Sequence, residues 1–274
     1  MNPFVVSAVV NAFVAAVFGF VVYINNRKER VNKLFGFLNF SILVWSVGYV
    51  IWTLANEPSS ALLGLRVLSV GAAFIPILYF HWVVVFFNVD KSQTKLILFG
   101  YLISLLWGAS SFSNLFVQSV TEQKHFNIFL PVAGPLYAFY IATYALFVLY
   151  GISIVLQRYF DFKDGESPPS YLNFILIGSL VGFLGGATNF PIWYGYLFPP
   201  YGNFLVAFYA LVLSLAMIRF QIMNVRLIAT EIFVAIINAG LLYDLLTSNT
   251  LLDGVLRLVI FIIVAIFSYL VVKG

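Results

Sequence analysis

The chain has 274 residues, of which 62% are hydrophobic, 19% aromatic and 9% charged. Soluble domains carry about 25% charged residues, so this composition cannot cover a water-facing surface and indicates an integral membrane protein. The net charge of +4 comes from residues between apolar runs, which excludes a nucleic-acid-binding surface, and the absence of cysteine excludes disulfides, thiolate metal sites and cysteine nucleophiles.

Nine apolar runs of about the length that spans a bilayer follow one another along the chain. The predicted helices are 3–25, 34–55, 62–88, 96–118, 134–157, 170–190, 203–219, 227–243 and 254–273. The first run has no basic residue before it and a basic cluster after it, which favours a retained helix over a cleaved signal peptide. The longest connections, 119–133 and 158–169, leave no room for a soluble domain between helices.

The lysine and arginine residues between the runs set the predicted orientation. With the N-terminus outside, eleven of them fall on the inner side and three on the outer side, namely Arg66, Lys124 and Arg257. Basic residues favour the cytoplasmic side of a membrane. The expected fold is an all-α integral membrane protein, a polytopic bundle of about nine transmembrane helices (seven plus a C-terminal helical pair), with its N-terminus outside and its C-terminus cytoplasmic.

Two helices carry residues of one kind along a single face. Gly178, Gly182 and Gly186 recur every four residues in the sixth run, a spacing that lets a neighbouring helix approach closely. In the fifth run, a stripe is formed by Tyr137, Tyr140, Tyr144 and Phe147. Such a stripe is usually core, but buried tyrosine hydroxyls need partners, so Tyr140 and Tyr144 are also candidate ligand-binding residues.

A charge-free stretch rich in proline, glycine and aromatic residues joins the sixth and seventh runs, at residues 185–204. Its prolines cannot continue a helix, so the chain is expected to turn there at the outer surface. The aromatic residues fit an interfacial belt or a binding pocket, and both interpretations stay open. On the pocket interpretation, the candidate ligand-binding residues are Asn189, Trp193, Tyr194 and Tyr196.

Two ionisable residues inside the runs are candidates for coupling a signal, because charge in hydrocarbon is costly. His81 lies about 10 Å deep in the third run, and its alternatives are structural hydrogen bonding or a pH or coupling role. Glu231 lies about one turn inside the eighth run, where interfacial anchoring is the competing interpretation.

Several kinds of chemistry are not expected from these residues. The lysines lie in loops or at helix ends, so no mid-helix lysine can form a retinal Schiff base. The sequence contains no HExxH, GxSxG, Walker or GxGxxG motif and no paired carboxylates within the bilayer. We therefore expect no catalytic residues, no cofactor and no metal site.

Residues 32–88 resemble the second and third helices of the seven-helix sensor region that begins many bacterial membrane histidine kinases. A basic inner loop leads into a Trp-x-x-Gly-Tyr element at Trp45, Gly48 and Tyr49. After a short outer loop, the third helix has Leu-Arg, small residues and a proline, here Leu65, Arg66, Gly71 and Pro76. A second block, from Gly185 through Thr188, Asn189, Pro191, Pro199, Tyr201 and Gly202 to residues 218–222, is similar to the end of that region.

The resemblance implies a membrane sensory input module at residues 1–226, followed by a two-helix membrane segment at 227–274 that leads towards a cytoplasmic output. It further implies a location in the bacterial cytoplasmic (inner) membrane. The implied partners are the lipid bilayer, a cytoplasmic histidine kinase or other output domain, an unknown small ligand and, as an open option, a second copy in a homodimer. Because the 274 residues contain no phosphoacceptor helix or ATP-binding glycine boxes, the chain itself is not expected to be an enzyme.

A small-solute transporter or permease component is the alternative from another class. Transporters favour internal repeats, broken helices at the midplane and buried charge. The interruption at 185–200 fits this description, but the first half has no matching interruption and the runs contain no midplane carboxylate.

Overall fold

The computed structural model describes residues 3–123, 128–161, 168–196 and 202–219, with five single positions near the C-terminus. Two compact units divide the chain, Met1–Met217 and Ile218–Gly274. The helices and strands named below lie in the first unit, except for the last two residues of the seventh helix. The predicted eighth span, 227–243, lies outside the described residues, and so does the ninth, 254–273, apart from helical backbone at residues 255, 258, 261, 262 and 265.

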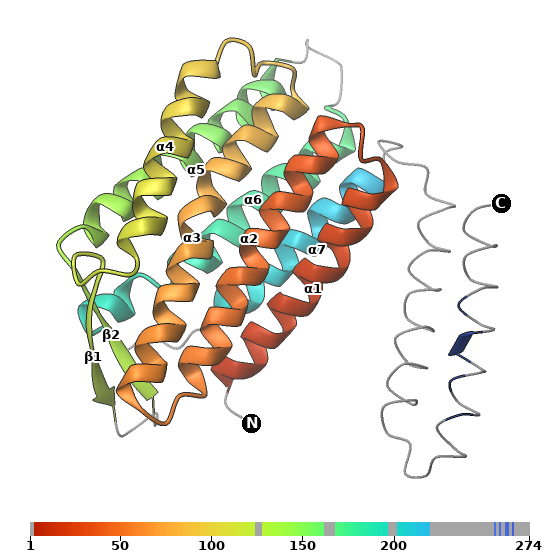
Figure 1. Ribbon diagram of the computed structural model, residues 1–274. Coiled ribbons are helices and arrows are strands. Elements are labelled where there is room, and N and C mark those ends of the chain that lie inside the picture. Colours follow the sequence, from red (N-terminus) through yellow and green to blue (C-terminus); the bar gives the residue numbers. More distant parts are fainter. Residues whose placement is uncertain are drawn as a thin grey trace. The chain divides into compact units, whose positions relative to one another are not determined.

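The described part of the first unit is a bundle of seven α-helices with a small β-hairpin (Figure 1). The helices are α1 (Pro3–Asn25), α2 (Arg30–Thr53), α3 (Pro58–Phe86), α4 (Thr94–Ser110), α5 (Tyr137–Phe160), α6 (Ser170–Ala187) and α7 (Asn203–Arg219). The strands are β1 (Val117–Gln123) and β2 (Ile128–Ala133), and a 3₁₀ turn η1 (Pro191–Tyr194) follows α6. The first seven predicted runs each correspond to one of these helices.

Hydropathy and length make this a multi-pass membrane protein. Among the described residues, five helices are long and apolar enough to cross a bilayer, namely α1, α2, α3, α5 and α6, whereas α4 and α7 are shorter. Large apolar side chains remain exposed on the outside of the bundle, among them Phe20 (63%), Phe40 (62%) and Leu149 (65%). Lipid satisfies such surfaces, and the backbone polar groups are paired within the helices.

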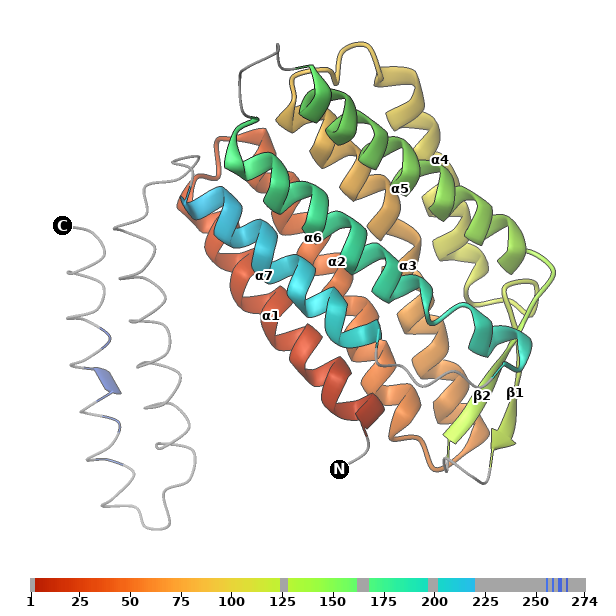
Figure 2. The same cartoon turned by 180° about the vertical axis from the view of Figure 1, so that it is seen from behind.

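Helix α3 forms the centre of the bundle, in contact with α2, α4 and α5. Its side chains Tyr79, Phe80 and Trp82 are completely buried. Figures 1 and 2 show α7 beside α1 and α6 on the far side of α2. A hydrogen bond from the Asn11 amide of α1 to the Asn203 carbonyl of α7, 2.9 Å long, agrees with this arrangement.

The predicted outer connection 119–133 contains an antiparallel hairpin that the sequence analysis did not predict. Val120 pairs with Pro131 and Gln123 pairs with Ile128. The helix before it ends at Ser110, eight residues earlier than the predicted boundary at 118. Serine hydroxyls cause this early end, because Ser110 and Ser111 both donate to the Trp107 carbonyl, at 3.0 and 2.8 Å, and favour a turn.

The two ends of the bundle hold different connections. The N-terminus, the hairpin and η1 lie at one end, and the connections after α1 and α3 lie at the other (Figures 1 and 2). At that second end, the Arg30 guanidinium and the Asp90 carboxylate form an ion pair of 2.8 Å. Consecutive helices therefore run in opposite directions, as expected for a chain that crosses a membrane repeatedly.

Candidate functional site

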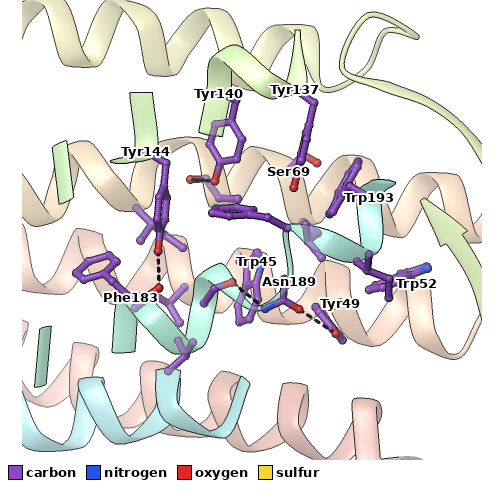
Figure 3. Close-up of a pocket in the computed structure, with 18 of the residues that line it drawn as sticks. Trp45, Tyr49, Trp52, Ser69, Tyr137, Tyr140, Tyr144, Phe183, Asn189 and Trp193 are labelled. Carbon is purple, nitrogen blue, oxygen red and sulfur yellow. Dashed lines mark hydrogen bonds between the residues drawn. The ribbon is translucent and has the colours of Figure 1, made fainter. Parts of the chain in front are cut away.

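An aromatic cavity lies inside the bundle near the end that carries η1 (Figure 3). Its volume is about 70 Å³. One water needs about 10–15 Å³ of such space, so several waters or a small ligand would fit. The residues that line the cavity are Ile42, Trp45, Tyr49, Trp52, Leu68, Ser69, Ala72, Ile75, Phe116, Tyr137, Tyr140, Tyr144, Gly182, Phe183, Gly186, Asn189, Phe190, Ile192, Trp193, Val206 and Tyr209.

The tyrosine stripe of α5 forms one wall. Successive positions three and four residues apart share a helix face, and here that face turns inward. The Tyr140 hydroxyl donates to the Ala72 carbonyl of α3 at 3.2 Å. The Tyr144 hydroxyl donates to the Phe183 carbonyl of α6 at 2.9 Å. Both hydroxyls thus anchor α5 to its neighbours while the rings line the cavity (Figure 3).

The turn after α6 forms the outer edge of the cavity. Pro191 begins η1, and Gly195 ends it with a φ of 81°, a left-handed conformation that favours glycine. This turn buries Trp193, which stacks on Tyr137 with ring centres 4.2 Å apart and planes 17° apart. Tyr194 and Tyr196 are 49% and 71% exposed and do not line the cavity.

Asn189 joins three helices at the side of the cavity. Its Nδ2 donates to the Asn203 Oδ1 of α7 at 2.6 Å and to the Gly186 carbonyl of α6 at 3.0 Å. Its Oδ1 accepts from the Tyr49 hydroxyl of α2 at 3.2 Å. Asn203 continues the network to α1, where its carbonyl accepts from Asn11 at 2.9 Å. A polar network of four helices therefore begins at a residue that lines the cavity.

Three aromatic residues of α2 form the opposite wall and were not predicted as site residues. Trp45, Tyr49 and Trp52 are nearly fully buried and follow one another at spacings of four and three. Trp45 and Tyr49 entered the sequence analysis as part of the Trp-x-x-Gly-Tyr element. The same helical stripe argument that selected the tyrosines of α5 would have found all three as cavity residues.

The Tyr209 hydroxyl of α7 is a further polar group at the cavity that the sequence analysis missed. Tyr209 is 3% exposed and lines the cavity from α7. Among the described residues, its hydroxyl has no hydrogen-bond partner. An unpaired buried hydroxyl is costly, so it is suited to a ligand or water that offers a hydrogen bond.

No charged side chain belongs to the set of described residues that line the cavity. Aromatic rings, aliphatic groups, hydroxyls and one amide make up the lining. Charge in such a place would be poorly solvated. The arrangement therefore suits a small, uncharged ligand with apolar surface and one or two hydrogen-bonding groups.

The two predicted coupling residues lie elsewhere. His81 is half-buried on α3, and its Nδ1 lies 2.9 Å from the Tyr101 hydroxyl of α4. His81 does not line the cavity. Its contact with Tyr101 agrees with the structural interpretation, and its coupling role stays a prediction. Glu231 lies outside the described residues. No group of three potential metal ligands occurs among the residues that the structure describes.

Comparison with known protein families identifies a match. The model of the family described as "N-terminal 7TM region of histidine kinase" matches residues 3–228, which include helices α1 to α7 and the whole cavity. No curated protein matches the chain.

Proposed function

Because the chain belongs to the family of the N-terminal 7TM region of histidine kinase, we propose that it is a membrane sensory input module of a two-component-type system. It passes an extracellular or membrane cue to a cytoplasmic histidine kinase output. The observation that carries the proposal is the uncharged aromatic cavity beside Asn189, whose hydrogen bonds reach α2 and α7.

The ligand site comprises the cavity residues and its outer edge. Asn189, Trp193, Tyr140 and Tyr144 line the cavity, and the exposed Tyr194 and Tyr196 form a lip where a cue from outside or from the bilayer would first make contact. The uncharged lining favours a small neutral compound over an ion. Trp193, stacked on Tyr137, would have to move for a larger ligand to enter.

Coupling to the output follows from the position of Asn203 at the start of α7. A ligand shifts a bundle only by the difference in its affinity for two arrangements. Rearranging one hydrogen bond, at about 1 kcal/mol, would change the ratio of two such arrangements about fivefold. Helix α7 leads on to residues 227–274, the proposed link to the kinase.

The wider proposal concerns the membrane and the partners. We place the N-terminus outside, the C-terminus in the cytoplasm, and residues 1–226 and 227–274 as sensor and two-helix link in the bacterial inner membrane, with nine spans in total. A homodimer and a separate or joined kinase as output fit this arrangement. The family match covers a sensor region and does not favour the small-solute transporter.

The test joins a histidine kinase core after residue 274 and measures autophosphorylation in proteoliposomes. Asn189→Ala and Trp193→Ala are expected to change basal autophosphorylation about fivefold without changing membrane insertion. Leu149→Ala, at a 65% exposed position on α5, is the matched control and should leave basal autophosphorylation unchanged.

Two outcomes would count against this proposal. Unchanged autophosphorylation in both cavity variants, at normal insertion, would exclude the cavity from signalling. A change with Tyr196→Ala alone would move the site to the exposed lip. Radiolabelled-solute uptake by the same proteoliposomes should be zero for a sensor.

A further inference from the structure

A second apolar hollow lies on the opposite side of α2 from the aromatic cavity, between α1 and α2. It has an open volume of about 650 Å³ and extends from Leu43 and Ala16 to Tyr23 and Phe37. Tyr23 contributes the one polar side-chain group among the described residues that line it. From Ala15 to Tyr23 the α1 wall rises about 12 Å, at 1.5 Å per residue.

The walls of this groove are exposed aromatic side chains and its floor is narrow. Phe20 on α1 is 63% exposed, and Phe37 and Phe40 on α2 are 53% and 62% exposed. At the floor, a Cβ on Gly19 would lie 2.5 Å from the Asn39 Cβ, so the two helices meet there without intervening side chains. The result is a long apolar channel open to the side of the bundle.

A basic residue lies beyond each wall at the same end. On α1, Tyr23 follows Phe20 at a spacing of three, and Arg27 lies in the turn after the helix with its guanidinium 5.8 Å from the Tyr23 ring centre. On α2, Lys33 precedes Phe37 by four residues, which places both on one face. The Tyr23 and Phe37 rings, 6.4 Å apart, close the groove just before these cations.

The acidic residues near this end of the groove leave Arg27 and Lys33 free to bind an anion. Arg30 is engaged by Asp90 at 2.8 Å on another side of α2. Glu29 is the acidic residue of the same connection, and Arg27, Lys28 and Lys33 outnumber it. Arg27 and Lys33 are both exposed.

We propose that this groove is a binding site for one anionic diacyl phospholipid, with an acyl chain between α1 and α2 and the phosphate held by Arg27 and Lys33. Basic residues at the membrane surface attract anionic lipids by about 1 kcal/mol each, which is about fivefold per residue. An apolar channel that ends at two cations matches the shape and the charge of such a lipid. The proposal is independent of the sensory function.

The test measures lipids retained by the purified full chain in native mass spectrometry. The chain is equilibrated with phosphatidylglycerol or phosphatidylcholine of identical acyl chains, and separately with glycerol phosphate. We expect a clear preference for phosphatidylglycerol and no retention of glycerol phosphate, since the acyl chain is required. Arg27→Gln with Lys33→Gln should lower the preference about 25-fold.

Two further variants distinguish lipid binding in the groove from a general effect of positive charge on the chain. Lys91→Gln with Lys95→Gln removes the same charge from exposed residues away from the groove and should keep the preference. Ala16→Trp, at an exposed lining position, should fill the channel and reduce retention of both lipids. An equal loss in both double variants, or equal retention of the two lipids by the unmodified chain, would overturn the proposal.

A labelling experiment would detect two other possible occupants of the groove, namely a second copy of the chain and a segment of the chain itself. The chain has no cysteine, so Ala16→Cys introduces a unique thiol. Disulfide-linked dimers through residue 16 would identify a second copy in the groove. Protection of this thiol from a membrane-permeant maleimide in lipid-free detergent would identify a segment of the chain itself. Either result would refute the lipid site, whereas labelling that falls as phosphatidylglycerol is added supports it.

Discussion

Asn189 is the residue at which binding and coupling meet. Its amide uses both kinds of hydrogen-bonding atom, donating to Asn203 and Gly186 and accepting from Tyr49. A buried polar group that loses its partner is costly, so each of these bonds favours one position of its helix. A ligand that competed for Asn189 would release α2 and α7 together. The same property makes Asn189 the first residue to test by substitution.

Asp90 gives a pH-dependent prediction at the residue scale. The hydrogen bond from the Arg30 guanidinium holds the pKa of Asp90 below its ordinary value. A depressed carboxyl pKa contributes stability that is present above the unfolded-state pKa of about 3.9 and is lost as the pH falls through the folded-state value. Arg30 is 62% exposed, so the contribution should be at most about 1 kcal/mol.

The measurement compares thermal unfolding of the unmodified chain and Asp90→Asn between pH 7 and pH 3. The unmodified chain should be slightly more stable at pH 7, and the difference should begin to shrink as the pH falls below about 4. A constant difference across this range would mean that the ion pair contributes nothing through its charge.

At the scale of elements, the contact between α2 and α3 is the closest in the bundle. A Cβ on Gly48 would overlap the backbone nitrogen of Leu68, one on Gly64 the backbone nitrogen of Trp52, and one on Gly71 that of Trp45. The predicted glycine face of α6 does pack against α7, tightly at Gly182 against Tyr209, but with ordinary contact distances at Gly186. Backbone contact between α2 and α3 is what brings Trp45 and Tyr49 to the cavity.

Gly48→Ala should therefore separate α2 from α3 and destabilise the chain by about 1–3 kcal/mol, the usual cost of overpacking. Gly108→Ala on α4 is the matched control, because its Cβ would lie 3.4 Å from the Phe74 ring, an ordinary contact. Unfolding in a denaturing detergent measures both. Equal stability of the two variants would show that the α2–α3 contact can relax.

At the scale of the whole molecule, the prediction concerns orientation. Because the chain has no cysteine, Ser92→Cys and Gln118→Cys each introduce a single reactive thiol at an exposed position. The alternating helices separate these positions to opposite ends of the bundle. In intact cells, a membrane-impermeant maleimide should label residue 118 and leave residue 92 unlabelled until the membrane is broken. The reverse labelling pattern would invert the proposed orientation.

The seven described helices could be predicted from the sequence, because hydropathy and length depend only on residues that are near each other in the chain. The tyrosine stripe of α5 was predictable for the same reason, since its period is that of a single helix. The hairpin was not, because β1 and β2 are stabilised by pairing with each other and by the bond of 2.5 Å from the Trp52 indole to the Phe129 carbonyl. Trp52 and Phe129 are 77 residues apart in the sequence, so this contact depends on the tertiary structure.

The sequence by itself determined that this is a membrane protein and which family it resembles. It also determined the helix ends to within a few residues over most of the bundle. Only the tertiary structure decided which aromatic residues meet. Tyr140, Tyr144, Asn189 and Trp193 share one cavity, whereas Tyr194 and Tyr196 lie outside it. The physical reason is that a cavity is formed by faces of several helices, and glycine contacts and hydrogen bonds between those helices set how the faces are turned.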